Sequence, residues 1–381
     1  MNIKDQSCDT LHVCTSNTNV LRPIVLSSGG TGGHLFPALS VADEIEKSGR
    51  TALLVTDNRG VLFFKNHKKK PALVCTIHRK HWLFGRLVYP FSLGFQILKC
   101  FIWLKRVKPA AVIGFGGYPS FPCTYAAQWL KIPTVLHEGN AFLGKANRAL
   151  APKAERIALS FPPSESTVID ERYYVTGNPV RGGIRDLISE AYQSPDVKGD
   201  FQLLVIGGSQ GAKIFSQLLP QAVQKLSPEL QKRLVITQQC REPLLNDTQI
   251  AYAEQTNCRV ELKTFLSPIE NYYKTAHLVI ARAGASTVAE VSIAGKPTLF
   301  VPFQGSVEGD QAQNAAQLMT EQAAWVLRES SLNADKLAAF LKEKMEQPES
   351  LAEKAALIRT FAHPKAAQSV WELVTDVLEK S

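Results

Sequence analysis

The sequence predicts an α/β protein of two similar domains, each with a parallel sheet and crossover helices. Short runs of apolar, β-branched residues alternate with helical patterns along the chain. A unit of strand, glycine loop and helix occurs once near residue 24 and again near residue 203. The length of 381 residues agrees with two domains, because it exceeds what one hydrophobic core usually serves.

The elements follow this pattern in order. A buried strand at 24–26 runs into a glycine loop and a helix through 37–42, and further strands are expected at 51–55, 110–113 and 134–136. The pattern restarts with strands expected at 203–206, 234–237 and 277–280, and the chain after about residue 333 is helical in character, with breaks at Pro348 and Pro364. We expect a polar extension at 1–21, a first domain at 22–180, a linker at 181–198, a second domain at 199–363, and a helix at 364–381 that packs toward the first domain.

Cysteine usage and the lack of targeting patterns indicate a cytoplasmic protein. The seven cysteines form no C-x-x-C pair, so we interpret them as reduced thiols and expect no metal site. The N-terminus has no apolar core of the kind a signal peptide needs. The longest uncharged stretch, 109–130, contains several glycines and prolines, so we do not expect it to form a membrane-spanning helix.

Positive charge is concentrated in one region. No acidic residue occurs between Asp57 and Glu138, and that interval holds thirteen lysines and arginines, whereas the net charge of the whole chain is only +9. The rest of the chain is therefore slightly acidic. This asymmetry excludes a protein that binds nucleic acid over its whole surface. The basic region instead requires a partner that binds locally.

Two glycine loops suggest a ligand between the domains. Glycines at 29, 30, 32 and 33 let a ligand approach the backbone, and the helix that follows offers free N–H groups and partial positive charge to a phosphate. A tight turn without a ligand has a similar sequence, and the loop is neither a Walker A motif nor a dinucleotide fingerprint. The loop at 207–212 repeats the arrangement, so the two loops would face each other across a cleft at the carboxyl ends of both sheets.

A third element, at 282–290, has the same strand-to-helix character. Ser286 and Thr287 can present donors to a pyrophosphate at a helix start, and Glu290 can accept hydrogen bonds from two ribose hydroxyls. The alternative is an ordinary capped helix with a solvated glutamate.

Seven motifs in a fixed order now identify a family. They are GGTGGHLFPALSVA, GFGGYPSFP, HEGNAFLGKANR, TGNPVR, GGSQGA, ARAGASTVAE and VPF…DQAQNA. Over residues 22–375 the chain closely resembles the MurG family of peptidoglycan synthesis, whose members transfer N-acetylglucosamine (GlcNAc) from UDP-GlcNAc to a lipid-linked muramyl-pentapeptide. The resemblance implies a GT-B fold of two Rossmann-like domains and inversion at the anomeric carbon. It also implies that the nucleotide-binding site uses no metal or other cofactor.

The resemblance also implies roles for individual residues. The first domain would bind the acceptor and the membrane, and the second would bind UDP-GlcNAc. Glu290 would bind the ribose, backbone groups near Leu266 would bind uracil, and Gln311 and Asn314 would contact the sugar hydroxyls. The full set of donor-binding residues implied is Thr31, Gly32, Gly33, Asn140, Arg181, Ser209, Leu266, Ala285, Ser286, Thr287, Val288, Ala289, Glu290, Gln311 and Asn314.

The implied reaction needs a base. The muramyl 4-hydroxyl attacks the anomeric carbon and UDP leaves, so a group must take the hydroxyl proton while helix N-termini and Arg181 stabilise the diphosphate. We take His34 as the candidate base, because imidazole titrates near neutral pH. The alternative is that His34 only hydrogen-bonds the loop or the donor. His137 and Glu138 are rivals, as the base or as groups that orient the acceptor diphosphate.

The chain departs from the family pattern at three places. Members of the family usually have Gln at the position of Gly139 and Ser at the position of Ala283. The loop at 303–310 is about one residue longer, which bears on the sugar contacts implied for Gln311.

Aromatic and basic residues in the acid-free region suggest a membrane-binding face. The set comprises Trp82, Phe84, Arg86, Phe91, Lys99 and Trp103. Aromatic side chains would enter the headgroup layer while cations meet anionic lipid, and a lipid-linked acceptor requires such docking. The alternative is a buried helix whose cations snorkel to solvent. The expected location is peripheral, on the cytoplasmic face of the bacterial inner membrane, with other cell-wall synthesis proteins as further candidate partners.

Two other functions compete with this one. A GT-B transferase acting on diacylglycerol would share the fold, but the HEGN, GFGGY and TGNPVR motifs argue against it. A nucleotide- or nucleic-acid-binding module would use the basic region, but the sequence has no RRM, KH or helix-turn-helix signature, and nucleic acid is not an expected partner.

Overall fold

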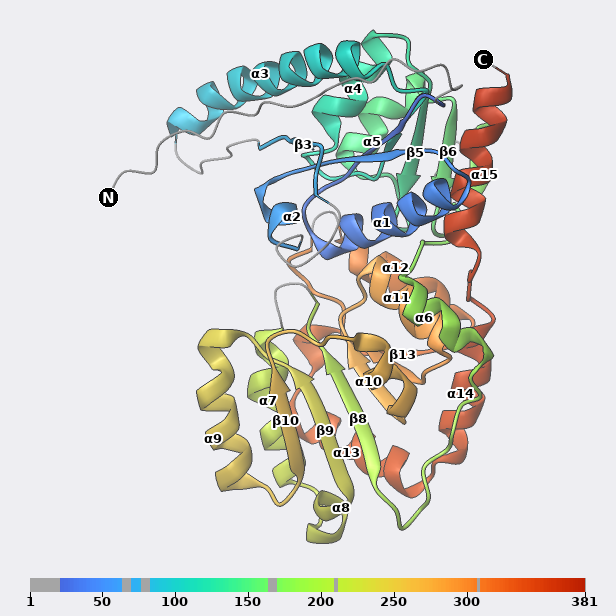
Figure 1. The fold of residues 1–381 in the computed structure, drawn as a ribbon. Helices are drawn as coiled ribbons and strands as arrows, with labels where there is room; N and C mark the ends of the chain where they lie inside the picture. The colour runs from blue at the N-terminus through green and yellow to red at the C-terminus, as the bar shows by residue number, and fades with distance from the viewer. Residues whose placement is uncertain are drawn as a thin grey trace.

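The computed structural model describes residues 21–63, 70–76, 83–163, 170–208, 212–306 and 309–380, with the backbone alone at 63 and 83–89. These residues form two α/β domains, one above the other in Figure 1. The predicted fold class is confirmed: the strand pairs in both sheets are parallel, and helices connect most successive strands.

The sheet of the first domain has seven strands in the order β3-β2-β1-β4-β5-β6-β7. Their bounds are β1 Ile24–Ser27, β2 Ala52–Thr56, β3 Leu73–Val74, β4 Ala111–Gly114, β5 Thr134–Glu138, β6 Arg156–Leu159 and β7 Tyr173–Val175. The helices are α1 Gly32–Lys47, α2 Asn58–Phe63, α3 Leu83–Val107, α4 Phe121–Trp129 and α5 Lys145–Leu150. The central strands β1 and β4 are buried along their whole length, as their apolar sequences predict.

The sheet of the second domain has six strands in the order β10-β9-β8-β11-β12-β13. Their bounds are β8 Phe201–Ile206, β9 Leu234–Gln239, β10 Arg259–Lys263, β11 Leu278–Ala281, β12 Thr298–Phe300 and β13 Trp325–Val326. The helices that follow the first domain are α6 Gly182–Arg185, α7 Lys213–Gln224, α8 Pro228–Arg233, α9 Leu245–Gln255, α10 Ile269–Thr275, α11 Ala285–Ala294, α12 Asp310–Thr320, α13 Ala334–Glu346, α14 Glu349–Arg359 and α15 Ala366–Glu379.

The last helix returns to the first domain. In Figure 1 α15 rises beside α1 and β6, away from the sheet of the second domain. Its apolar side, with Val370, Trp371 and Val374, belongs to the same buried cluster as Ile24 and Leu35. An ion pair of 3.0 Å joins Arg156 on β6 to Asp376 on α15. The chain therefore crosses between the domains twice, once at α6 and once after α14.

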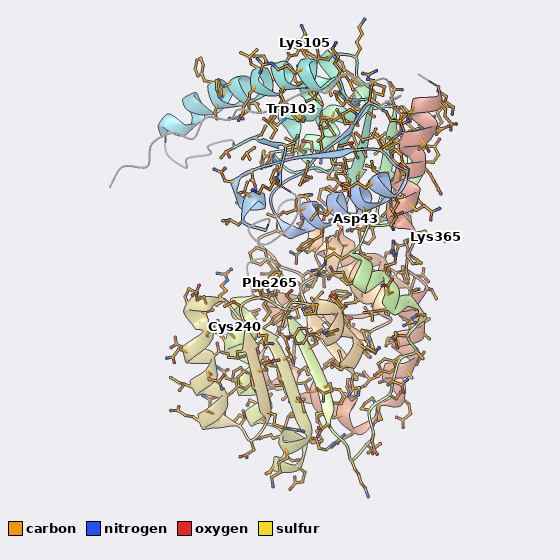
Figure 2. All side chains as sticks on the ribbon, in the orientation of Figure 1. Asp43, Trp103, Lys105, Cys240, Phe265 and Lys365 are labelled. Carbon is orange, nitrogen blue, oxygen red and sulfur yellow. The ribbon has the colours of Figure 1, made fainter. Side chains whose placement is uncertain are left out.

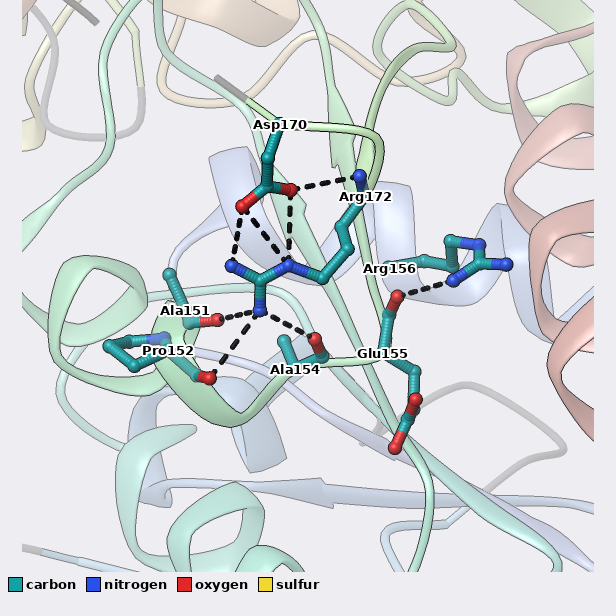
Figure 3. A network of polar contacts seen from close by, with 7 residues as sticks. All are labelled: Ala151, Pro152, Ala154, Glu155, Arg156, Asp170 and Arg172. Atoms are coloured by element: carbon teal, nitrogen blue, oxygen red, sulfur yellow. Dashed lines mark hydrogen bonds and ion pairs between the residues drawn. The ribbon is translucent and has the colours of Figure 1, made fainter. Parts of the chain in front are cut away.

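An arginine fixes the outer edge of the first sheet. The Arg172 guanidinium, just before β7, donates to the carbonyl oxygens of Ala151 and Ala154 at 3.0 and 3.1 Å, and it pairs with Asp170 (Figure 3). Those carbonyls lie at the short helical turn after α5, where a cation is favourable beside C=O groups that point out of the turn. The contact ties β7 to the connection between α5 and β6.

Within the described part of the chain, no helix combines the length and apolar character needed to cross a membrane.

Candidate active site

Residues predicted for the site from both domains meet at the junction between the two sheets. The Ser286 hydroxyl at the start of α11 lies 3.4 Å from the carbonyl oxygen of Gly33 in the first turn of α1. Asn314 on α12 accepts a hydrogen bond from the backbone N–H of Ala141 at 2.9 Å and donates one to Asn140 at 3.2 Å. We take this junction as the candidate active site.

Two helix N-termini supply the positive end of the site. Thr31 is the N-cap of α1 and Gly284 is the N-cap of α11, and neither helix has a side-chain cap. The first N–H groups of both helices are therefore available to an anion, and the helix dipoles favour negative charge there. In the second glycine loop Gly208 has a positive φ of 76°. Ser209 in that loop lies outside the described residues.

His34 lies in a cradle of glycines. A Cβ on Gly29 would stand 3.1 Å from His34 Cδ2, and one on Gly117 would stand 3.3 Å from His34 Nε2. Gly117 also has a φ of +76°, which L side chains rarely adopt. The GFGGY motif after β4 thus leaves room for the imidazole of a residue 83 positions earlier in the sequence. Sequence reasoning did not connect these two motifs.

The imidazole of His34 is uncharged at neutral pH. Desolvation lowers its pKa below the ordinary 6.5, and a hydrogen bond to the backbone of Phe115 opposes that shift only partly. A neutral imidazole can accept a proton, as a general base must. Among the three candidate bases, His34 is the most exposed, because its side chain is only partly buried.

His137 lies deeper, at the end of β5. It is 1% exposed, its Nε2 lies 3.3 Å from the Ser160 hydroxyl, and its ring packs against Phe115 at a centroid distance of 5.3 Å. Desolvation lowers its pKa to about 4. The His137 side chain is therefore enclosed by protein, and these contacts give it a packing role.

Glu138 organises the loop after β5. Its Oε1 accepts a hydrogen bond from the backbone N–H of Asn140 at 3.0 Å. Its Oε2 accepts from the N–H of Gly144 and from Asn147 Nδ2, both at 2.9 Å. Burial raises the pKa of Glu138 and these hydrogen bonds oppose the rise. A carboxylate already bonded to three groups of one loop fixes the shape of that loop.

Glu290 and Arg181 form an ion pair beside the junction, in which the carboxylate is buried and the guanidinium is partly exposed. Glu290 Oε1 accepts from Arg181 Nη2 at 3.1 Å and Oε2 accepts from the Tyr273 hydroxyl at 3.0 Å. The Arg181 guanidinium also stacks on Phe36 of α1, 4.3 Å from the ring centroid. Burial raises the pKa of Glu290, while Arg181 and Tyr273 oppose the shift. Nothing in the sequence singled out Tyr273 or Phe36.

The remaining predicted donor residues lie on the second-domain side. The Leu266 side chain is buried in the core, next to the exposed Phe265 (Figure 2), so its backbone is the part that a ligand could reach. Val288 lies in the same core cluster, whereas Ser286, Thr287 and Ala289 are partly exposed. Gln311 accepts a hydrogen bond from the backbone N–H of Phe303 at 3.0 Å.

Arg282 is a site residue that sequence reasoning missed. Its guanidinium forms two bonds of 2.9 and 3.0 Å to the carboxylate of Glu329 and donates to the carbonyl oxygen of Val301 at 2.9 Å. It also lies 5.2 Å from the ring centroid of Phe303. Arg282 therefore anchors the start of the loop that carries Phe303 and leads to Gln311. The only feature of the sequence that could have indicated Arg282 is its position directly before Ala283 and Gly284.

The membrane-face prediction falls mainly on α3, at the outer side of the first domain (Figure 1). Phe91 is 80% exposed, and exposed apolar side chains recur along one side of the helix at Phe95, Leu98 and Ile102. Trp103 is partly buried and packs against the core near Cys100 (Figure 2). Lys99 is exposed and donates to the carbonyl oxygen of Val74 at 2.9 Å. Trp82 and the side chains of Phe84 and Arg86 lie outside the described part.

Both domains match one glycosyltransferase family. The glycosyltransferase family 28 N-terminal domain matches residues 24–159, and the C-terminal domain of the same family matches residues 202–370. The chain is 39% identical over 362 residues to the UDP-N-acetylglucosamine--N-acetylmuramyl-(pentapeptide) pyrophosphoryl-undecaprenol N-acetylglucosamine transferase of Rhodospirillum centenum, covering 93% of this chain and 94% of that protein. It is 39% identical to the enzyme of the same name from Mesorhizobium japonicum, covering 92% and 94%.

Solved structures agree with the sequence matches. The crystal structure of Acinetobacter baumannii MurG superposes with a TM-score of 0.73 at 28% identity, covering 95% of this chain and all of that one. A UDP-GlcNAc 2-epimerase from Neisseria meningitidis bound to UDP-GlcNAc shares the fold, with a TM-score of 0.65 at 14% identity and coverage of 93% and 100%. The chain therefore belongs to glycosyltransferase family 28, within the family of UDP-N-acetylglucosamine--N-acetylmuramyl-(pentapeptide) pyrophosphoryl-undecaprenol N-acetylglucosamine transferases.

Proposed function

We propose that this enzyme transfers GlcNAc from UDP-GlcNAc to the 4-hydroxyl of undecaprenyl-diphospho-N-acetylmuramyl-pentapeptide (lipid I), giving the lipid-linked disaccharide (lipid II) for peptidoglycan synthesis. The observation that carries the proposal is identity of 37–39% to curated transferases of this name over nearly the whole chain. The junction between the domains supports it, because helix N-termini and an arginine converge there. These groups suit a nucleotide diphosphate.

The residues would divide the reaction between the two domains. Glu290 would hold the ribose after Arg181 turns from its carboxylate to the diphosphate, where its charge stabilises the departing UDP. The N-terminus of α11 would add backbone donors to the same diphosphate. His34 would take the proton of the muramyl hydroxyl, and Glu138 would hold the loop that presents Asn140 to the sugar.

Helix α3 would contact the membrane. The face with Phe91, Phe95, Leu98 and Ile102 is exposed, and Lys99, Lys105 and Arg106 lie on the same helix. An apolar strip accompanied by cations fits an anionic lipid surface. We infer that the enzyme binds the cytoplasmic face of the inner membrane peripherally through this helix, where the lipid-linked acceptor is found.

The test is transfer of radiolabelled GlcNAc from UDP-GlcNAc to two lipid acceptors. Label should appear in the muramyl-pentapeptide lipid and be absent from diacylglycerol offered under the same conditions. Transfer to diacylglycerol alone would favour a glycerolipid transferase instead. Absence of transfer to either acceptor, with both lipids dispersed in the same detergent, would contradict the proposal.

A further inference from the structure

Asn178, in the TGNPVR motif, carries a buried carboxamide without a hydrogen-bond partner in the described part of the chain. It is 3% exposed, and neither its Nδ2 nor its Oδ1 has a hydrogen-bond partner among the described residues. Two other buried asparagines are better paired. Asn147 Nδ2 donates to Glu138 and to the carbonyl oxygen of His137, although its Oδ1 has no partner among the described residues. Asn314 accepts from Ala141 and donates to Asn140. Burying an unpaired amide costs free energy, so a ligand that pairs it would offset that cost.

The carboxamide faces the junction between the domains. A Cβ on Gly139, in the loop after β5, would stand 3.9 Å from Asn178 Nδ2 and 3.8 Å from the Cβ of Ala285. Gly139 precedes Asn140, and Ala285 is the first residue of α11. Asn178 therefore lies where a loop of the first domain, the start of the crossover and the α11 N-terminus converge. Because residue 139 is glycine, that loop places no side chain between Asn178 and Ala285.

We propose that Asn178 binds a secondary amide of a substrate. Nδ2 would donate to the amide carbonyl while Oδ1 accepts from the amide N–H, a pairing that a carboxamide makes with both of its polar ends. This inference rests on the proposed function, in which the GlcNAc of the donor and the muramyl sugar of the acceptor each carry a 2-acetamido group. The place of Ala285 at the head of α11 favours the donor sugar, and Asn178 then selects GlcNAc over glucose.

The test compares the affinities of two donors that differ in this amide. Titration calorimetry with UDP-GlcNAc and with UDP-glucose is run on the full chain and on Asn178→Ala. The variant should lose about tenfold or more in affinity for UDP-GlcNAc and less than about twofold for UDP-glucose, since a missing partner matters only to the ligand that carries the amide. Should the amide belong to the acceptor, both donors would bind as before and KM for the lipid-linked acceptor would rise by a similar factor.

Asn178→Leu gives a second variant. It keeps a side chain of similar size but removes both polar ends of the carboxamide, so it should weaken UDP-GlcNAc binding in the same selective way. Thermal unfolding separates fold from binding: Asn178→Ala should keep its Tm, because it removes no hydrogen bond, whereas Asn147→Ala should lower it. Equal weakening of both donors, or no change in the two donor affinities and the acceptor KM, overturns the proposal. Failure of the wild-type chain to transfer GlcNAc would instead contradict the proposed function.

Discussion

His34 is the residue on which the proposed chemistry depends most. It combines partial exposure with a pKa below 6.5 and a site between two glycine turns. His137 and Glu138 are nearly fully buried and engaged with Ser160 and with the loop at 140–147. All three candidate bases were predicted from the sequence. Only the structure distinguishes them, because the burial of each side chain depends on segments that are distant in the sequence.

Replacing the base should slow the chemical step and leave donor binding intact. We expect His34→Ala to reduce turnover by roughly 10²-fold or more, as is usual for loss of a general base, while UDP-GlcNAc affinity stays within a few-fold. Turnover is measured with radiolabelled donor at saturating acceptor, and affinity by calorimetry. A variant with near-normal turnover would rule out His34 as the base.

The pH dependence should report the same imidazole. A base acts in its deprotonated form, so kcat/KM should rise with pH through the pKa of His34 and then level off. Because desolvation lowers that pKa, the rise should be centred below 6.5, and activity should be lost only in more acidic solution. A pH–rate profile at constant ionic strength checks this, and a limb centred above 6.5 would contradict the assignment.

The turn after β4 is the element that admits His34. Gly117→Ala should cost about 1 kcal/mol of stability through its positive φ and, in addition, displace the imidazole. Gly49→Ala is the matched control, because Gly49 has a φ of +80° with no atom within 4 Å of an added Cβ. Both variants should unfold at similarly reduced temperature, and only Gly117→Ala should lose most of its turnover. Equal activity of the two variants would show that the turn does not position the base.

Helix α3 should carry the membrane affinity. Phe91→Asp combined with Phe95→Asp should reduce binding to anionic vesicles severalfold in a flotation assay, because both side chains are exposed on one face of the helix. Ile250→Asp, at an exposed position on α9 of the second domain, is the control and should bind like wild type. High salt should release the wild-type protein. Unchanged binding of the double variant would place the contact elsewhere.

Several buried strands were predictable from apolar runs. The central strands β1, β8 and β11 each contain such a run, so their sequences indicate them directly. The strands β3, β6, β7, β10, β12 and β13 were not predicted. The edge strands β7 and β10 mix polar and apolar types, and β3, β12 and β13 have only two or three residues each, too few to show a pattern. Tyr273 and Arg282 could not be assigned either, since their partners Glu290 and Glu329 meet them only through the tertiary fold.

The whole molecule is two sheets that close on a shared junction, held by segments that cross between them. Asn314 contacts Asn140 and Ala141, and Arg185 pairs with Glu44 of α1 at 3.0 Å. The sequence indicated the two halves because the strand, loop and helix unit repeats. It did not indicate these contacts, which depend on how the domains face each other.

A crystal structure of the enzyme bound to UDP-GlcNAc is the most direct test of the proposed donor site and base. We predict that the uridine lies against Leu266 and Glu290, with the diphosphate at the N-terminus of α11. The anomeric carbon should face His34 across the junction, with His137 and Glu138 still bound to Ser160 and to the loop at 140–147. A donor bound away from this junction, or an anomeric carbon closest to Glu138, would contradict it.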